Sequence, residues 1–180
     1  MSALNDPQAL REQYRTEAGL AARSALYEET TGRYAGDVQA FPFEGGMFDA
    51  VAANWMLYHV PDVDCALSEL ARVLTPHGRL VAVTVGKDNL LELWRLVGAE
   101  RARLARPIAF GAENGAQMLS RRFRTVEARD ASGTVRIGDR DAVERYVSST
   151  ATWKRYAERV PAELEPFRAR RSNVVLVADK

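Results

Sequence analysis

The feature that most constrains the fold of this sequence is a pair of short apolar runs with an amphipathic stretch between them. Residues 48–53 (FDAVAA) are rich in small apolar side chains, which predicts a strand buried on both faces. Asp62 then precedes apolar residues at helical spacing, which are Ala66, Leu67, Leu70, Val73 and Leu74. Pro76-His77-Gly78 predicts the end of that helix, and residues 79–85 (RLVAVTV) predict a second buried strand. Strands that alternate with helices indicate an α/β layered domain.

The remaining segments continue this alternation. Helical patterns predict helices over residues 7–30, 88–106, 115–122, 139–148 and 151–159. Apolar runs predict strands over residues 123–128, 135–137 and 174–178. No internal repeat and no low-complexity linker divides the sequence, so we expect a single domain over residues 1–180.

Composition and charge exclude several classes of protein. The 180 residues are 47% apolar and carry a net charge of +1, which argues for a globular domain and against a strongly basic nucleic-acid binder. Cys65 is the single cysteine, so an internal disulfide is excluded; its position in the predicted helix favours a buried thiol. The sequence has neither an apolar leader nor a run of about 18 apolar residues. We therefore expect a cytoplasmic protein with no membrane and no nucleic-acid partner.

The segment from Gly36 to Gly86 carries a more specific pattern. Its elements are GDV at 36–38, FPF at 41–43 followed by FD at 48–49, LYHVPD at 57–62 and ARVLTPHGRL at 71–80. In order and spacing they resemble the S-adenosylmethionine-dependent class I methyltransferases, specifically the small-molecule group called type 11. The resemblance implies a Rossmann-like methyltransferase sheet with flanking helices.

The resemblance also implies where a cofactor would bind. Ligands of open α/β sheets sit outside the carboxyl ends of the strands. By analogy with the family, Asp37 accepts a hydrogen bond from the adenine amino group and the backbone at Val38 offers another. Asn54 and Trp55 directly follow the strand at 48–53 and are expected at the same rim, so these four residues are the cofactor-binding candidates.

One part of the family pattern is missing. The family has a Gly-rich turn upstream of the GDV element and an acidic residue for the ribose hydroxyls about 20 residues later. This sequence contains no G-x-G, and Gly19, Gly32 and Gly36 are its only glycines before Asp37. A βαβ unit needs about 30 residues, and the chain is too short for the missing elements. We therefore expect a single truncated methyltransferase-like domain with an internal deletion of its cofactor-binding half.

Two expectations follow from the deletion. The chain should bind no cofactor by itself, and S-adenosylmethionine should bind only if the site is completed in trans. The strand at 48–53 loses its former neighbour and becomes a sheet edge, which must be covered. A homodimer is the expected cover.

The candidate catalytic residues are His59, Tyr58 and Asp37, which supply an imidazole, a phenol and a carboxylate for proton transfer. Each also has a plainer interpretation: a structural loop histidine, an aromatic wall, and a relic of an adenine contact. No metal-site spacing and no Ser-His-Asp pattern occurs. The aromatic residues expected near a remaining pocket are Trp94, Phe110, Trp153 and Tyr156.

Three functions stay open on the sequence. The first is a methyltransferase-like protein without the methyl donor that binds or transforms a small hydrophobic metabolite, by cyclisation, dehydration or isomerisation. The second is a methyltransferase whose cofactor site is completed by a dimer or a partner chain. The third is a non-catalytic regulator of a paralogous enzyme.

Overall fold

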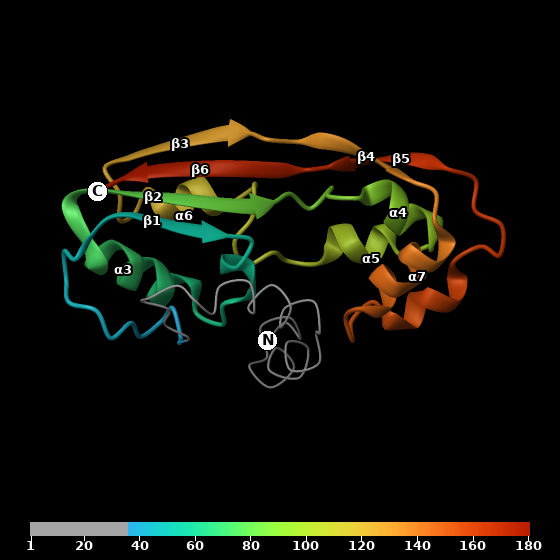
Figure 1. Cartoon of the computed structure of the whole chain (residues 1–180), viewed down its shortest axis with the longest axis horizontal. Helices are drawn as coiled ribbons and strands as arrows, with labels where there is room; N and C mark the ends of the chain where they lie inside the picture. The colour runs from blue at the N-terminus through green and yellow to red at the C-terminus, as the bar shows by residue number, and fades with distance from the viewer. Residues whose placement is uncertain (1–35) are drawn as a thin grey trace, which may run out of the picture.

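The computed structural model describes residues 36–180, in which strands and helices alternate (Figure 1). Its main sheet contains, in spatial order, β1 (Phe48–Asn54), β2 (Leu74–Val85), β6 (Asn173–Asp179) and β3 (Thr125–Asp130). β1 and β2 are parallel, whereas β6 is antiparallel to both β2 and β3. The expected α/β class, a sheet with flanking helices, is confirmed. The helix expected over residues 7–30 lies outside the described residues.

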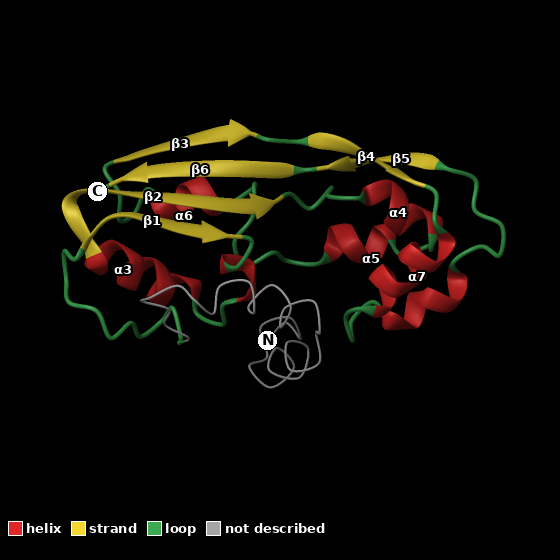
Figure 2. Ribbon diagram, in the orientation of Figure 1, coloured by secondary structure: helices red, strands yellow, loops and turns green. Residues whose placement is uncertain are grey.

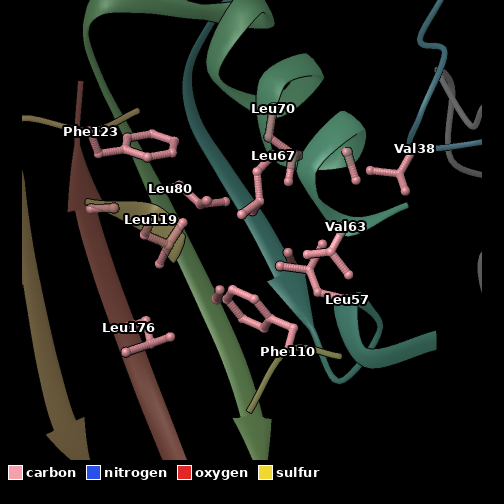
Figure 3. Close-up of a cluster of buried hydrophobic side chains, with 14 of the residues drawn as sticks. Val38, Leu57, Val63, Leu67, Leu70, Leu80, Phe110, Leu119, Phe123 and Leu176 are labelled. Carbon is pink, nitrogen blue, oxygen red and sulfur yellow. The ribbon is translucent and has the colours of Figure 1, made fainter. Parts of the chain in front are cut away.

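The first hydrophobic core forms where α3 (Val63–Val73) and α6 (Gly115–Leu119) pack on this sheet. Figure 3 shows Leu67 and Leu70 of α3 in one cluster with Leu80 of β2 and Leu176 of β6. Phe110 lies in the same cluster and is fully buried. The apolar stripe read from the sequence therefore faces the core, as predicted.

The two ends of α3 show which sequence signals determine where the helix begins and ends. The Asp62 carboxylate accepts a hydrogen bond from Cys65 N at 2.9 Å and caps the first turn. Cys65 itself is exposed, so the prediction of a buried thiol is wrong, because this position lies off the apolar stripe. The helix ends at Val73 and β2 begins at Leu74, which places Pro76 inside the strand rather than in the stop of the helix.

β1 forms one edge of the sheet among the described residues, as the sequence predicts. The expectation that it is buried on both faces is wrong. Only Ala53 of its seven residues is buried, because among residues 36–180 a strand lies on one side of β1 only. Met47, which precedes β1, and Trp55, which follows it, are exposed as well.

The two faces of the main sheet differ in how far their side chains are buried. Leu80 and Ala82 of β2 are buried in the first core, whereas Val81 and Val83 point to the opposite face and are half-buried. The register pairs Val81 with Val177 and Val83 with Val175 of β6. These four residues form an apolar strip, here called the valine face.

A second lobe holds the remaining helices. It contains α4 (Leu91–Leu96), α5 (Glu100–Ala105), α7 (Arg140–Ser148) and the 3-10 helix η3 (Lys154–Arg159), next to a two-stranded ribbon of β4 (Gly133–Ile137) and β5 (Phe167–Arg171) (Figure 2). Its hydrophobic core is separate from the first and consists of Leu93, Trp94, Val97, Ala99, Val143, Val147, Trp153, Tyr156, Ala157 and Val160.

Two expectations for this lobe need correction. The single helix expected over 88–106 is wrong, because Gly98 adopts a left-handed conformation (φ +66°) that separates α4 from α5. The helix expected over 151–159 is a short 3-10 helix that starts at Lys154. β5, at Phe167–Arg171, was not predicted at all.

The two lobes are joined by an antiparallel ribbon in which β3 leads into β4 and β5 leads into β6 (Figure 1). At the junction, Gly86 N donates to Ser172 O at 3.1 Å and Ser172 N donates to Asn89 Oδ1 at 3.0 Å. A Cβ at Gly86 would lie 2.6 Å from Ser172 Oγ, so a larger residue at this crossing would require that side chain to move. Within residues 36–180, no helix has the length and apolar character needed to span a bilayer.

Candidate functional site

A cavity of about 500 Å³ lies between the two lobes, and we call it the interlobe cavity. Its lining comes from the turn after β1, the end of β2, the segments around α4 and α5, and the region from α7 to Trp153. The lining residues are Tyr58, His59, Val85, Asn89, Trp94, Arg103, Arg106, Pro107, Ile108, Ala109, Tyr146, Ser149, Thr150 and Trp153. Because β1 and β2 are parallel and both end here, the cavity lies at the rim where open α/β folds bind ligands.

A single 3-10 turn, η2 (Leu57–His59), brings Tyr58 and His59 to this cavity. Leu57 anchors the turn in the first core at 2% exposure, and His59 N donates to Met56 O at 2.9 Å. The Tyr58 and His59 rings contact each other, with their centroids 4.4 Å apart. Burial, and then the charge of Arg106, lower the pKa of His59 below its usual 6.5. His59 is therefore neutral at neutral pH, which suits a proton acceptor.

Two arginines of the second lobe face the same cavity. Arg103 and Arg106 are three residues apart, at the end of α5 and directly after it, which places them on one side of the helix. Burial lowers the pKa of both guanidinium groups, although an arginine remains charged at neutral pH. Neither arginine was predicted as a site residue, because nothing in the sequence separates them from the solvated arginines elsewhere.

Aromatic rings form the apolar wall of the interlobe cavity. Trp94 and Trp153 are in contact, with centroids 4.8 Å apart, and the Arg106 guanidinium carbon lies 5.7 Å from the Trp153 ring centroid. Both tryptophans line the cavity, where the sequence led us to expect them. Tyr156 packs in the second core and Phe110 in the first, and neither is part of this lining.

Asp37 and Val38 line a different cavity, of about 410 Å³, which lies beside β1 and is here called the edge cavity. His59 lines it too, so the structure brings His59 to both cavities and Asp37 to one. The Asp37 carboxylate is exposed and accepts hydrogen bonds from Gln39 N and Gln39 Nε2, at 2.9 and 3.0 Å. Gln39 Oε1 in turn accepts from Asp62 N, which fixes this turn against the start of α3.

Trp55 lines a third cavity, of about 590 Å³, on the other side of Tyr58. Trp55 (φ 49°) and Leu90 (φ 56°) are the two non-glycine residues with left-handed backbones among residues 36–180, and both line it. Such backbones are strained for large side chains and gather at functional sites. Asn54 is exposed at the end of β1 and belongs to none of the three linings.

A mixed α/β sheet with cavities at the carboxyl ends of its parallel strands defines the Rossmann-like class of ligand-binding folds. Residues 8–82 match the family model of the methyltransferase domain. The resemblance to the class I methyltransferases of type 11 is thereby confirmed over residues 8–82, which are less than half of the chain.

One sequence relative and two solved structures are similar to parts of this chain or to its fold. Over 49 residues the chain is 47% identical to a demethylmenaquinone methyltransferase of Mycolicibacterium gilvum, a match that covers 27% of this chain but only 22% of that protein. The fold is similar to the YcgJ protein of Bacillus subtilis (TM-score 0.59, 16% identity, 92% of this chain and 79% of that one). It is also similar to a candidate methyltransferase of Bacillus halodurans C-125 (TM-score 0.51, 20% identity, 92% and 80%).

Members of this family use S-adenosylmethionine, so the described residues can be compared with its needs. Asp37 is the one carboxylate in the edge-cavity lining within residues 36–180, and the rest of that lining is mostly apolar. A carboxylate can accept a hydrogen bond from an amino group such as that of an adenine. Within residues 36–180 this lining offers no second carboxylate for a ribose, so the described residues do not fit the whole molecule.

Proposed function

We propose that this methyltransferase-like chain binds a small, largely apolar metabolite in the interlobe cavity and acts on it by proton transfer, without binding the methyl donor itself. The observation that carries the proposal is the composition of that cavity: His59 and Tyr58 meet a wall of tryptophans at the rim of the sheet. The lining of the edge cavity, by contrast, offers a single carboxylate among the described residues.

The chemistry assigned to His59 is that of a general base. A neutral imidazole takes a proton from one position of the metabolite and returns the same proton to another, which is an isomerisation that needs no further reactant. Tyr58, in ring contact with His59, positions the substrate or donates a hydrogen bond. Losing one placed acid or base costs about 10²–10⁴ in rate, so His59→Ala and Tyr58→Phe are expected to lower turnover by this factor.

Loss of donor binding is tested by titration calorimetry of the full chain with S-adenosylmethionine. We expect no binding heat at low micromolar donor, because ribose and methionine contacts are missing from the sequence pattern. A low-micromolar Kd that Asp37→Asn weakens would contradict this expectation and support a working donor site at Asp37.

Metabolite binding is tested with a neutral apolar probe, 2-naphthamide. Ala109 lines the interlobe cavity, so Ala109→Trp is expected to fill it and abolish probe binding. Ala105→Trp is the matched control, because Ala105 is exposed at the end of α5 and outside the lining. Circular dichroism checks that both variants fold. Equal probe affinity in the two variants would contradict a binding site in this cavity.

A second candidate is a methyltransferase whose donor site is completed by another copy of the chain. The exposed edge strand β1 and the half-buried valine face favour it, because a second copy would cover both. Light scattering then gives twice the 20.0 kDa of one chain, and donor binding appears only in the dimer. A stable monomer at micromolar concentration would contradict this candidate.

A further inference from the structure

The third cavity, which Trp55 lines, lies where the turn after β1 meets the second lobe. Its volume of about 590 Å³ falls within the range of small-molecule sites, about 300–1,000 Å³. Other parts of its lining come from the start of α4, from the ribbon of β4 and β5 and from α7. The aliphatic side chains of that lining are Leu90, Leu93, Val135, Ile137, Ala142 and Val143. The cavity can therefore bury the apolar part of a small molecule.

Two strained residues meet at this cavity. Trp55 and Leu90 hold large side chains on left-handed backbones, at φ 49° and 56°. Trp55 N donates to Val83 O at 2.8 Å, which fixes the first of these conformations. Leu90 N donates to Arg170 O at 2.8 Å, which fixes the second. Such strain persists only where the surrounding structure enforces it, and it gathers at ligand-binding sites.

The Trp55 side chain is open to a ligand. It is 45% exposed, whereas Trp94 and Trp153 are buried. Within residues 36–180, the Trp55 ring contacts neither another aromatic ring nor a cation. Tyr146 of α7 is exposed to the same extent and lines the same cavity. An apolar surface left exposed beside a cavity marks a binding site.

The third cavity also holds positive charge. Arg136 and Arg171 line it, and neither makes an ion pair or a side-chain hydrogen bond within residues 36–180. Arg170, next to Arg171 in β5, differs because it pairs with Asp88 at 3.5 Å. Asp139 is the one acid of the lining among the described residues, and its carboxylate caps α7 by accepting from a backbone N–H at 3.1 Å. Two arginines against one acid leave the lining with a net positive charge.

The register of the ribbon favours an anion at both arginines. Arg171 lies opposite Gly133, where a Cβ would meet no atom within 4 Å. The space beside Arg171 is therefore open. Arg136 lies opposite Arg168, and like charges in directly opposite positions are destabilising. An anion bound at Arg136 would reduce that repulsion.

We propose that the third cavity binds a medium-chain alkyl carboxylate, whose chain packs against the aliphatic lining and Trp55 and whose carboxylate pairs with Arg171 and Arg136. An aliphatic lining suits an alkyl chain, because hydrophobic contact needs no directed partner. Arginine suits the acid group, because its planar fork matches both oxygens of a carboxylate. This inference goes beyond the proposed function and does not depend on it, since His59 is not part of this lining.

The test is titration calorimetry of the full chain with three probes of one chain length: octanoate, neutral octanamide and cationic octylammonium. We expect octanoate to bind about fivefold more tightly than octanamide, the preference that a partly exposed ion pair supplies. Octylammonium should bind weakest, and added salt should reduce the preference for octanoate. Octanoate should also change the fluorescence of Trp55, and Trp55→Phe should remove that change.

Charge variants assign the preference to residues. Arg171→Gln and Arg136→Gln should each lower the affinity for octanoate and leave that for octanamide unchanged. The double variant should bind the two probes equally. Arg101→Gln is the control that changes the net charge by the same amount, because Arg101 is exposed on α5 and lies outside the lining.

Variants that fill space assign the binding to this cavity. Ala142→Trp is expected to fill the third cavity and abolish octanoate binding. Ala105→Trp is the matched control, because Ala105 is exposed and outside the lining. Ala109→Trp, which fills the interlobe cavity, should leave octanoate binding unchanged, because Ala109 is not part of the third cavity. Circular dichroism checks that all three variants fold.

Each contrary result overturns a stated part of the inference. Equal affinity for octanoate and octanamide would overturn the carboxylate class, and a preference that survives the double variant would overturn the assignment to the two arginines. Octanoate binding that survives Ala142→Trp, or that is lost in Ala109→Trp, would overturn the choice of cavity. No binding of any probe up to millimolar concentration would overturn the whole inference and leave the proposed function intact, because 2-naphthamide tests that function separately.

Discussion

Thr84 carries a hydroxyl group in the middle of an otherwise apolar strand. The one side-chain hydrogen bond that it makes allows a direct test of what keeps the cavity wall in place. Its side chain is fully buried in β2, and Oγ1 donates to Phe110 O at 2.8 Å. Phe110 directly follows the segment 107–109, which lines the interlobe cavity. Thr84→Val keeps the shape but leaves the Phe110 carbonyl without this donor.

The loss of this hydrogen bond determines the expected cost in stability. A buried acceptor left without its donor costs about 1–3 kcal/mol. The unfolding free energy of the lobe that contains β2 should fall by this amount. Because the carbonyl next to the cavity wall is released, the affinity for 2-naphthamide should fall as well.

Urea denaturation followed by circular dichroism measures the stability, and calorimetry measures the probe affinity. Thr84→Ser is the matched control: it keeps the hydroxyl and gives up one methyl group, at a cost of about 1 kcal/mol with no loss of probe affinity. The reasoning is refuted if Thr84→Val is as stable as the natural chain and binds the probe equally well. It is also refuted if the serine variant is the less stable of the two.

The other predictions concern a histidine and a glycine. Because the pKa of His59 is lowered in the folded chain, its stabilising contribution is complete above about pH 6.5 and is lost as the pH falls below that value. His59→Gln should therefore flatten the decline in unfolding free energy between about pH 7 and pH 5. Gly98→Ala forces a side chain into a left-handed backbone and should cost about 1–2 kcal/mol in a urea titration. Gly133→Ala, where a Cβ meets open space, should stay within about 0.5 kcal/mol.

Local sequence signals predicted the fold best where they agreed with each other. α3 has its cap at Asp62 and its apolar stripe in one place, and the structure follows both. The helix expected over 88–106 has the stripe but also contains Gly98, and the backbone freedom of that glycine outweighed the periodicity. β5 was not predicted because three of its five residues are arginines. With so many charged residues, the alternation of Phe167 and Ala169, the two residues of this strand that are at least partly buried, is not recognisable as a strand pattern.

Only some residues of the candidate site could be predicted from the sequence. Tyr58 and His59 could be placed because they follow a strand whose carboxyl end is a predictable rim. Arg103 and Arg106 could not, because burial of a charged side chain depends on the tertiary contacts of a second lobe. Trp55 was expected beside Asp37, and the structure places the two in different cavities, a distinction that depends on the left-handed turn of Trp55. Whether these residues are catalytic stays a prediction.

The separation of the two hydrophobic cores has a consequence for folding cooperativity. Among residues 36–180 no residue belongs to both clusters, and the interlobe cavity is lined by segments of both lobes. Without a ligand, each lobe can open at its own free-energy cost, so calorimetric unfolding is expected in two steps. A molecule that touches both Tyr58 and Trp153 makes the opening of one lobe break contacts to the other. Saturation with it should merge the two steps into one, because the ligand then supplies the contacts that a single domain obtains from its own side chains.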